Sequence, residues 1–393
     1  MHESASLATM SSMSPWEIVW ICLSLVMAAT ALTVSVLLWR ERRHRLHTQG
    51  RGLPDAAAGD AASSPPPRRV VAFVANPSKP DVESLKEPVL AACRATGLEP
   101  LWIETTVEDP GVGQAREAVA QGAEVVVATG GDGTVRAVAE AMIGTGVPMG
   151  LLPVGTGNLL ARNLDIPVTD LDEALTIALD GRDRSIDVGW LEVLEVPDAD
   201  DDDADLAEVG SKHLFTVIGG VGFDAAMVAD TNSTLKARVG WMAYFAAGVR
   251  HLHGRRLEAS IQLDDQPPVT TRLRTLLVGN CGRLPGGITL IPDAVVDDGI
   301  LDVAAIDTRG GIAGWAQLFG DVVLQGLGVK PVELPNRIGR IDHTQCRSIT
   351  ARVRGGEQAQ VDGDIIGRAS AIKAWVEPGA LLVRNPRRIT IGR

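Results

Sequence analysis

The residues with the clearest chemical potential form the segment Thr129–Arg136, which reads TGGDGTVR. An apolar run typical of a buried strand precedes it, and a helical pattern follows it. Glycines let a backbone approach a ligand closely and adopt positive φ. The start of a helix offers free N–H groups and the positive end of its dipole. The segment therefore predicts a phosphate-binding turn on a nucleotide site.

Asp132 within this turn needs a separate explanation, because a bare carboxylate beside phosphates is repulsive. It fits if Mg²⁺ lies between them, or if it serves the ribose or a proton transfer. The Walker pattern GxxxxGK[ST] is absent. A second glycine-rich turn, Pro153–Asn158 (PVGTGN), follows the next predicted strand and ends at the same edge. We expect the two turns to form one nucleotide cleft.

The two turns lie in a region where predicted strands and helices alternate. Apolar runs predict strands at 69–75, 101–103, 124–128 and 149–154, and helical patterns occupy 81–96, 111–121 and 134–143. Such alternation predicts a doubly wound α/β domain. Ligands of these sheets bind beyond the carboxyl ends of the strands, where both turns lie.

From about Ser185 the pattern changes to a β-rich domain with antiparallel sheets. The predicted strands are 186–193, 213–218, 257–263, 273–278, 301–306 and 349–353, with helices near 235–251 and 312–327. Residues Glu195–Glu208 carry eight acidic side chains and no basic one, and we expect a solvated loop there.

The motifs between residues 69 and 384, in their order, resemble the catalytic region shared by diacylglycerol kinases, sphingosine and ceramide kinases and bacterial soluble lipid kinases. GGDGT alone also occurs in NAD kinases and resembles phosphofructokinases. The further matching segments are Asn76-Pro77-Ser78, Gly220–Ala225, Gly279-Asn280 with Gly286-Gly287, Pro292–Asp302 and Val361–Asp364. The resemblance implies a nucleotide-binding α/β domain, a β-sandwich domain, and an active cleft between them.

The resemblance also implies roles for individual residues. Asp362 would be the general base for the lipid hydroxyl, while Asp298 with the carbonyls of Val295 and Ile300 would hold Mg²⁺. Asp132 would then belong to nucleotide binding. The residues expected to bind ATP are Asn76, Thr105, Gly130, Gly131, Asp132, Gly133, Thr134, Val135, Arg136, Thr156, Gly157 and Asn158.

Three positions depart from the family's pattern. Leu159 stands where an acidic residue often follows the second glycine turn. Asp364 replaces the usual glutamate of the late VDGE element, and it is shorter by one methylene. The opening motif reads NPSKP, so Lys79 takes the place of the family's lysine. These departures concern metal and substrate geometry and leave the predicted fold unchanged.

The N-terminal region predicts a membrane anchor. Residues Ile18–Trp39 carry no charge over 22 positions, a helix of about 33 Å that can cross a hydrocarbon core of about 30 Å. Tryptophans flank the run at both ends, and four arginines follow it within residues 40–45. By the positive-inside rule, the catalytic part is expected on the cytoplasmic side of the cell membrane. Residues 40–68 predict a basic, then Gly/Ala/Ser/Pro-rich tether.

The complete predicted organisation is a short tail at 1–15, a transmembrane helix at 16–39, the tether at 40–68, an ATP-binding domain at 69–184, a β-rich lipid-substrate domain at 185–370, and a segment at 371–393 that returns to the first domain. The net charge of −12 includes the eight acidic residues of the predicted loop, and no basic stripe accompanies it. Nucleic-acid binding is therefore not expected. The four cysteines are widely spaced, which argues against a zinc site or a disulfide framework.

Three functional hypotheses follow. The leading one is an ATP-dependent lipid kinase with diacylglycerol as the first acceptor to test, although sphingoid bases, ceramide, monoacylglycerol and polyprenols stay open. The second is an NAD kinase, which the GGDGT segment alone would also fit. The third is a membrane-bound nucleotide sensor without catalysis. The membrane lipid is the expected partner, and the oligomeric state, a homodimer included, is left open.

Overall fold

The computed structural model describes residues 69–198, 205–222, 256–284, 288–291, 293–308 and 339–387. The predicted transmembrane helix and tether lie outside the described residues, as do the two helices predicted near 235–251 and 312–327. Among the described residues, no helix is both long and apolar enough to cross a membrane.

The first part of the described chain is built on four parallel strands. These are β1 (Arg69–Ala75), β2 (Leu98–Glu104), β3 (Ala123–Gly130) and β4 (Met149–Pro153), in the order β2-β1-β3-β4. The central strands β1 and β3 are buried along nearly their whole length, as expected of apolar runs in a sheet covered on both faces. The four predicted strands are confirmed, with β2 longer than the sequence pattern indicated.

Five helices accompany this sheet: α2 (Pro80–Ala95), α3 (Val112–Ala120), α4 (Asp132–Met142), α5 (Leu159–Asn163) and α6 (Leu171–Asp180). Helix α2 begins with proline in its first turn, followed by two acidic residues that suit the helix dipole. Helix α6 begins at Asp170, whose carboxylate accepts from the N–H of Glu173 at 3.0 Å. The sequence analysis predicted α2, α3 and α4 and did not predict α5 or α6.

The strand order places a switch point between β1 and β3. From β1 the chain moves outward to β2, and it then crosses back to β3 on the other side of β1. The loops that leave β1 and β3 therefore diverge, and in such sheets the ligand crevice lies between loops of this kind, at the carboxyl edge. The loop Asn76–Lys79 and the GGDGT segment both begin at this edge.

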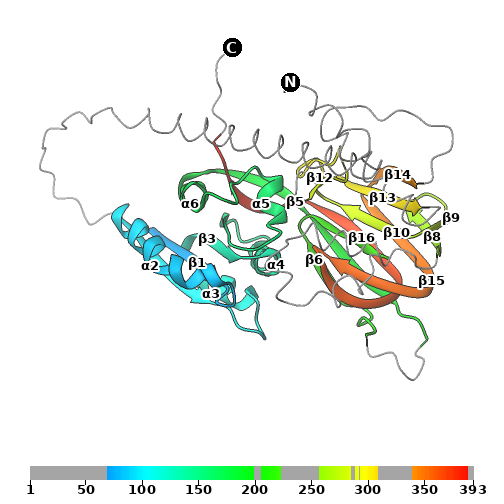
Figure 1. The fold of residues 1–393 in the computed structure, drawn as a ribbon, viewed down its shortest axis with the longest axis horizontal. Helices are drawn as coiled ribbons and strands as arrows, with labels where there is room; N and C mark the ends of the chain where they lie inside the picture. The colour runs from blue at the N-terminus through cyan, green and yellow to red at the C-terminus, as the bar shows by residue number, and fades with distance from the viewer. Residues whose placement is uncertain are drawn as a thin grey trace, which may run out of the picture. The chain divides into compact units, whose positions relative to one another are not determined.

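The second part of the described chain is antiparallel and β-rich (Figure 1). Its path β14-β13-β10-β7-β15-β16 carries the pair β5-β6 on β16 and the pair β8-β9 on β15. A core of its own, including Phe215, Leu191 and Ile372, lies inside. The strands are β5 (Arg182–Glu195), β6 (Lys212–Phe215), β7 (Ile218–Val221), β8 (Leu257–Leu263), β9 (Val269–Leu273), β10 (Thr275–Gly279), β13 (Leu301–Thr308), β14 (Gly339–Cys346), β15 (Ser348–Val361) and β16 (Asp364–Asn385), with a small hairpin of β11 (Arg283–Leu284) and β12 (Ile288–Thr289).

Strand β16 joins the two parts of the chain. It is 22 residues long, pairs with β15 and β5 in the β-rich part, and reaches β4 through Val383 and Met149. The described residues thus belong to one compact unit that spans Pro67–Arg393. The parallel and antiparallel parts thus share one sheet through β16, which limits how far they can move apart. This matters because the predicted site residues come from both parts.

Two smaller features from the sequence analysis, the acidic segment and the cysteines, can also be compared with the structure. The chain returns from the acidic segment beside β16, where Ala207 N donates to Arg368 O at 3.1 Å and Arg368 N donates to Asp205 O at 2.7 Å. Residues 199–204 of that segment lie outside the described residues. The three described cysteines, Cys93, Cys281 and Cys346, are buried free thiols.

Candidate active site

The crevice at the switch point brings the first group of predicted ATP-binding residues together. Asn76 follows β1, and its Nδ2 donates to the Thr134 hydroxyl at 3.2 Å, while its backbone N–H donates to Thr129 O at 3.0 Å. Thr105 follows β2, and its N–H donates to Ala75 O at 2.8 Å. The ends of β1, β2 and β3 are therefore fixed to one another beside the GGDGT segment.

The two glycine-rich turns pack against each other, backbone to backbone. A Cβ added to Gly155 would lie 2.5 Å from the Cα of Gly131, and one added to Gly157 would lie 2.4 Å from the Asp132 carboxylate. Real Cβ atoms essentially never approach other atoms below 3.0 Å. Glycine is therefore required for this contact, and the turns form one continuous wall of the crevice. The side chain of Thr156 is exposed on this wall.

Asp132 fixes the second turn to the first. Its Oδ2 accepts from the N–H of Asn158 at 3.0 Å, and its Oδ1 accepts from the N–H of Leu159 at 2.6 Å. Asn158 has a left-handed backbone with φ +49° and exchanges two side-chain hydrogen bonds with Gly155. The carboxylate of Asp132 thus accepts from the N–H groups at the start of α5. If Asp132 contributes to nucleotide binding, part of that contribution is to fix the conformation of the second glycine-rich turn.

The surroundings of Asp132 change its acidity. Its pKa is raised from 3.8 to about 6, first because burial penalises the charged form, and also because the Asp362 carboxylate is close. The hydrogen bonds from Leu159 and Asn158 oppose this shift. The negative charge of Asp362, in the turn before β16, therefore acts on Asp132 at the start of α4 and contributes to its raised pKa.

The raised pKa of Asp132 predicts a pH dependence of nucleotide affinity. Below about pH 6 its carboxyl gains a proton, and the protonated oxygen can no longer accept from a backbone N–H of the second turn. We expect the KM for ATP to rise as the pH falls through about 6. The measurement is KM between pH 5 and 8, with Asp132→Asn as the comparison, because asparagine does not titrate. Equal pH profiles for the two proteins would contradict this role.

Asp362 occupies the tight turn between β15 and β16 and is 6% exposed, with φ +48°. Its Oδ2 accepts from the N–H of Thr216 at 2.8 Å and from the Thr216 hydroxyl at 3.0 Å. Its Oδ1 accepts from the N–H groups of Val217 and Ile218, both at 2.9 Å. The carboxylate is therefore held firmly by the segment that joins β6 to β7.

These four donors bear on the predicted role of Asp362 as a general base. A carboxylate has about four lone-pair sites, so a substrate hydroxyl must take the place of one donor. Three of the donors are backbone N–H groups and cannot turn away. The Thr216 hydroxyl can rotate, so it is the donor that would give way to a lipid hydroxyl.

Two other predicted ATP-binding residues of α4 face away from the crevice. Val135 is buried in the apolar core beside α4. Arg136 directs its guanidinium to the turn that carries Asp362, where Nη1 donates to Val361 O at 2.9 Å and Nη2 pairs with Asp364 at 2.7 Å. The structure therefore brings Arg136 to the residues on either side of the Asp362-Gly363 turn.

The three predicted metal-binding residues lie together in one turn before β13. Asp298 accepts from the N–H of Ile300 at 3.0 Å through Oδ1, and Val295 is exposed. Asp187 supports this turn, because its Oδ2 accepts from the Gly299 N–H at 2.6 Å and its Oδ1 from the Gly379 N–H at 2.7 Å. The turn is thereby tied to both β5 and β16.

The charges around this turn favour a cation. The pKa of Asp298 is raised by partial burial and by the nearby carboxylates of Asp187 and Asp297, and a bound cation would relieve that repulsion. Among the described residues no group of three or more His, Cys, Asp or Glu side chains could hold a metal. A cation here would use one carboxylate, backbone carbonyls and water, which is the donor set that suits Mg²⁺.

Sequence reasoning gave no role to the two residues that connect these places, although Asn280 belongs to a segment that matches the family. Asn280, at the end of β10, donates from Nδ2 to Asp187 O at 2.8 Å and to Thr216 O at 3.3 Å. Asn280 thus links β5, whose Asp187 supports the Asp298 turn, to the segment that holds Asp362. Both Asn280 and Asp187 are almost fully buried. The available signal was a polar residue inside an otherwise apolar run, since such groups are buried only with partners.

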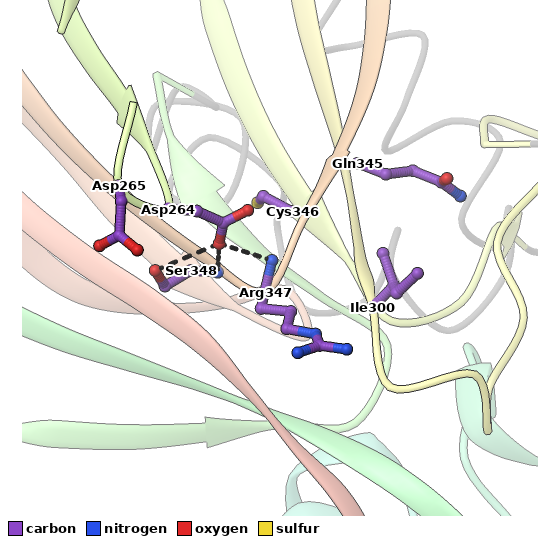
Figure 2. A pocket seen from close by; sticks show the side chains of 7 residues that line it. All are labelled: Asp264, Asp265, Ile300, Gln345, Cys346, Arg347 and Ser348. Carbon is purple, nitrogen blue, oxygen red and sulfur yellow. Dashed lines mark hydrogen bonds between the residues drawn. The ribbon is translucent and has the colours of Figure 1, made fainter. Parts of the chain in front are cut away.

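A depression of about 510 Å³ opens beside the same turn (Figure 2). The Asp264 carboxylate in its wall accepts from the N–H groups of Arg347 at 2.9 Å and Ser348 at 2.8 Å, which fixes the corner between β14 and β15. Acyl chains need an apolar lining, so we do not expect the lipid chains here. The lining residues are Asp264, Asp265, Ile300, Gln345, Cys346, Arg347 and Ser348.

Comparison with known proteins identifies the family. The sequence model of the diacylglycerol kinase catalytic domain matches residues 70–191, and that of the YegS C-terminal NAD kinase beta sandwich-like domain matches residues 217–385. A diacylglycerol kinase of Mycobacterium tuberculosis is 29% identical over 273 residues, which are 69% of this chain and 79% of the relative. A protein of Pseudomonas aeruginosa named "Probable lipid kinase YegS-like" is 32% identical over 310 residues, 76% of this chain and 88% of the relative.

Solved structures show the same fold. A diacylglycerol kinase of Bacillus anthracis strain Sterne superposes with a TM-score of 0.59 at 20% identity, covering 82% of this chain and 98% of that one. The predicted combination of a nucleotide-binding domain and a β-sandwich domain is confirmed. The family resemblance seen in the motifs is confirmed as well, and the chain belongs to the lipid kinases that share the diacylglycerol kinase catalytic domain.

Proposed function

We propose that this chain transfers the γ-phosphate of ATP to the hydroxyl of a membrane lipid, with diacylglycerol as the first acceptor and phosphatidic acid as the product. The observation that carries the proposal is the placement of Asp362. This buried carboxylate lies close enough to the glycine-lined crevice for its charge to raise the pKa of Asp132. The proposed phosphate site and the candidate base are also connected through α4, because Arg136 of this helix donates to Val361 O, next to Asp362. Transfer to a hydroxyl requires the two to be close.

The phosphates of ATP would occupy the crevice between β1 and β3. Helix α4 starts there with no side-chain cap on its first N–H groups, and an anion suits this end of the helix. Lys79 lies along the same wall, because a Cβ added to Gly131 would be 3.5 Å from its Cε. Its ammonium supplies the positive charge that the triphosphate needs.

Asp362 would accept the proton of the lipid hydroxyl. A hydroxyl is a weak nucleophile, and a positioned carboxylate strengthens it as the bond to phosphorus forms. In this arrangement the lipid hydroxyl replaces the Thr216 hydroxyl on Oδ2, while the backbone N–H groups of Val217 and Ile218 continue to hold Oδ1. The carboxylate therefore keeps its orientation during the transfer.

The turn at Asp298 would hold Mg²⁺, with the carbonyls of Val295 and Ile300 as further ligands. Bound Mg²⁺ would offset the negative charge that Asp187 and Asp298 concentrate there, while Asp297 is paired with Arg184 at 2.8 Å. We expect Asp298→Asn to raise the Mg²⁺ concentration needed for half-maximal activity by about 10-fold or more, with the KM for ATP unchanged at saturating Mg²⁺. Activity titrated with Mg²⁺ measures this. Asp172→Asn, an exposed site on α6, is the control, and equal Mg²⁺ dependence of both variants would contradict the assignment.

The acceptor is best identified by a screen. The purified chain is incubated with ATP and a total lipid extract, and the phosphorylated products are read by mass spectrometry. Phosphatidic acid as the main product supports diacylglycerol as the acceptor. Phosphorylated sphingoid bases, ceramide, monoacylglycerol or polyprenol would replace that acceptor and keep the lipid kinase. The absence of any phosphorylated lipid would contradict the proposed lipid kinase activity.

We also propose that residues 16–39 anchor the enzyme in the membrane, with the catalytic part on the cytoplasmic side. The support is the uncharged run with tryptophans at both ends and arginines after it. The full chain should stay in the membrane pellet after alkaline carbonate extraction. Leu25→Arg, in the middle of the run, should release part of it. Complete extraction of the unchanged chain would contradict the anchor.

A further inference from the structure

Arg136 and the turn that carries Asp362 make two contacts across 225 and 228 residues of sequence. The guanidinium Nη1 donates to the carbonyl of Val361, the residue immediately before Asp362. Its Nη2 pairs with the carboxylate of Asp364, the second residue after Asp362, at 2.7 Å. One side chain from α4 therefore holds both sides of the turn.

The turn that carries Asp362 is a two-residue hairpin turn between β15 and β16, and contacts outside the hairpin fix its position. Asp362 and Gly363 have φ +48° and +90°, two successive left-handed residues. Two positive φ values in succession are typical of a type I′ hairpin turn, in which the pair Asp-Gly is favoured. Inside the hairpin, Gly363 N donates to the side chain of Gln360 at 2.8 Å. Outside the hairpin, the segment that joins β6 to β7 holds Asp362 itself, whose N–H donates to Ile218 O at 2.7 Å. Arg136, whose side chain is 21% exposed, holds the residues on either side of the turn.

The surroundings of the pair agree with a fixed contact. A Cβ added to Gly133, in the first turn of α4, would meet only the Asp364 carboxylate, at 3.3 Å. The pKa of His213 on β6 is lowered, first by burial and then by the charge of Arg136. The guanidinium therefore lies between α4, β6 and the turn, at the point where the two parts of the chain meet.

We propose that Arg136 is a positioning residue for Asp362, joining the helix that begins at the glycine-rich turn to the turn that carries the base. This inference rests on the proposed phosphoryl transfer and refines it. Helix α4 then contributes to both halves of the site. Its start borders the proposed phosphate site, and Arg136, one turn further along, holds the turn that carries Asp362. In this assignment Arg136 makes no contact with ATP.

The geometry also accommodates the aspartate at position 364. The guanidinium must reach the Val361 carbonyl and the residue-364 carboxylate together, and it does so with the short side chain. Lysine at 136 would keep the charge but, as a single point donor, could not make the two-pronged contact. Asp364→Asn would remove the charge and keep the shape.

The test compares Arg136→Lys, Asp364→Asn and the double variant in the full chain. We expect each single change to lower kcat by about 10-fold and the double change to lower it by little more, because both remove one shared contact. The KM for ATP and the directly measured ATP affinity should stay within about twofold. Arg69→Lys, at the exposed pair with Glu124 on the other end of the sheet, is the control and should leave kcat unchanged.

Hydrogen exchange provides a second readout that needs no turnover. We expect the N–H groups of Asp362 and Gly363 to exchange faster in Arg136→Lys, while those of Gly131–Thr134 keep their rates. A loss of ATP affinity that matches the loss of kcat would overturn the assignment, as would multiplicative effects in the double variant. Unchanged exchange at Asp362 would overturn it too, whether or not the chain is active. Faster exchange in a chain that phosphorylates no lipid would refute the proposed function and leave the contact between Arg136 and the turn intact.

Discussion

Replacing Asp362 with asparagine is expected to lower kcat with a lipid acceptor by about 10²- to 10⁴-fold, the usual contribution of a general base. The asparagine amide cannot take the proton of the lipid hydroxyl. Its NH₂ group must also replace one of the two carboxylate oxygens, and each of these oxygens faces N–H donors. Two of the four hydrogen bonds from Thr216, Val217 and Ile218 are then lost. The folded state should also lose about 2–4 kcal/mol, because buried donors are left without acceptors.

Two further measurements separate the chemical effect from the structural one. The ATP affinity of Asp362→Asn, measured below its unfolding temperature, should remain, because the crevice is built from other residues. Thr216→Val removes the rotatable donor and leaves the three backbone donors in place, so it should cost far less activity than Asp362→Asn. Normal turnover by a folded Asp362→Asn variant would mean that Asp362 is not the base.

Gly155→Ala is expected to have the largest effect on the nucleotide site. The added Cβ would lie 2.5 Å from the Cα of Gly131 and 2.9 Å from Oδ1 of Asn158. The nearer of these atoms belongs to the backbone, so the two glycine-rich turns must separate. Forced packing of this kind costs about 1–3 kcal/mol. We expect a lower Tm together with a strong loss of ATP affinity.

Gly131→Ala is the matched control on the opposite turn. Its Cβ would meet the flexible Cε of Lys79 at 3.5 Å, which is an ordinary contact, and its φ is negative. The Tm of this variant should be close to that of the unchanged chain, even if phosphate binding is reduced. Equal loss of Tm in both variants, or in neither, would contradict the backbone contact between the turns.

The sequence predicted the features whose signals are local. The runs that became β1, β3 and β4 are continuous and apolar because both faces of the strands are buried. The α/β arrangement was expected from the alternation of strands and helices, and one nucleotide cleft from the glycines at two strand ends, whereas the switch point between β1 and β3 came from the structure. Helix α5 escaped notice because its five residues are too few for a periodic pattern. Helix α6 was missed although Asp170 is a typical N-cap.

The partners of individual side chains could not be predicted in the same way. Arg136 stands in the GGDGT helix, so its sequence position indicated ATP, yet its guanidinium contacts Val361 and Asp364. Asp132 was expected at the nucleotide, and its oxygens accept from Asn158 and Leu159. These partners depend on how the two parts of the chain pack, which no local pattern encodes. The predicted domain boundaries and the roles of the site residues stay predictions.

The most direct test of the account is the destination of the γ-phosphate. The purified full chain is incubated with γ-labelled ATP, Mg²⁺, diacylglycerol in detergent micelles and NAD in one reaction, beside a parallel reaction with Asp362→Asn. The account predicts label in the organic phase as phosphatidic acid, and almost none with the variant. Label in NADP, with an unlabelled organic phase, would contradict it and identify an NAD kinase instead.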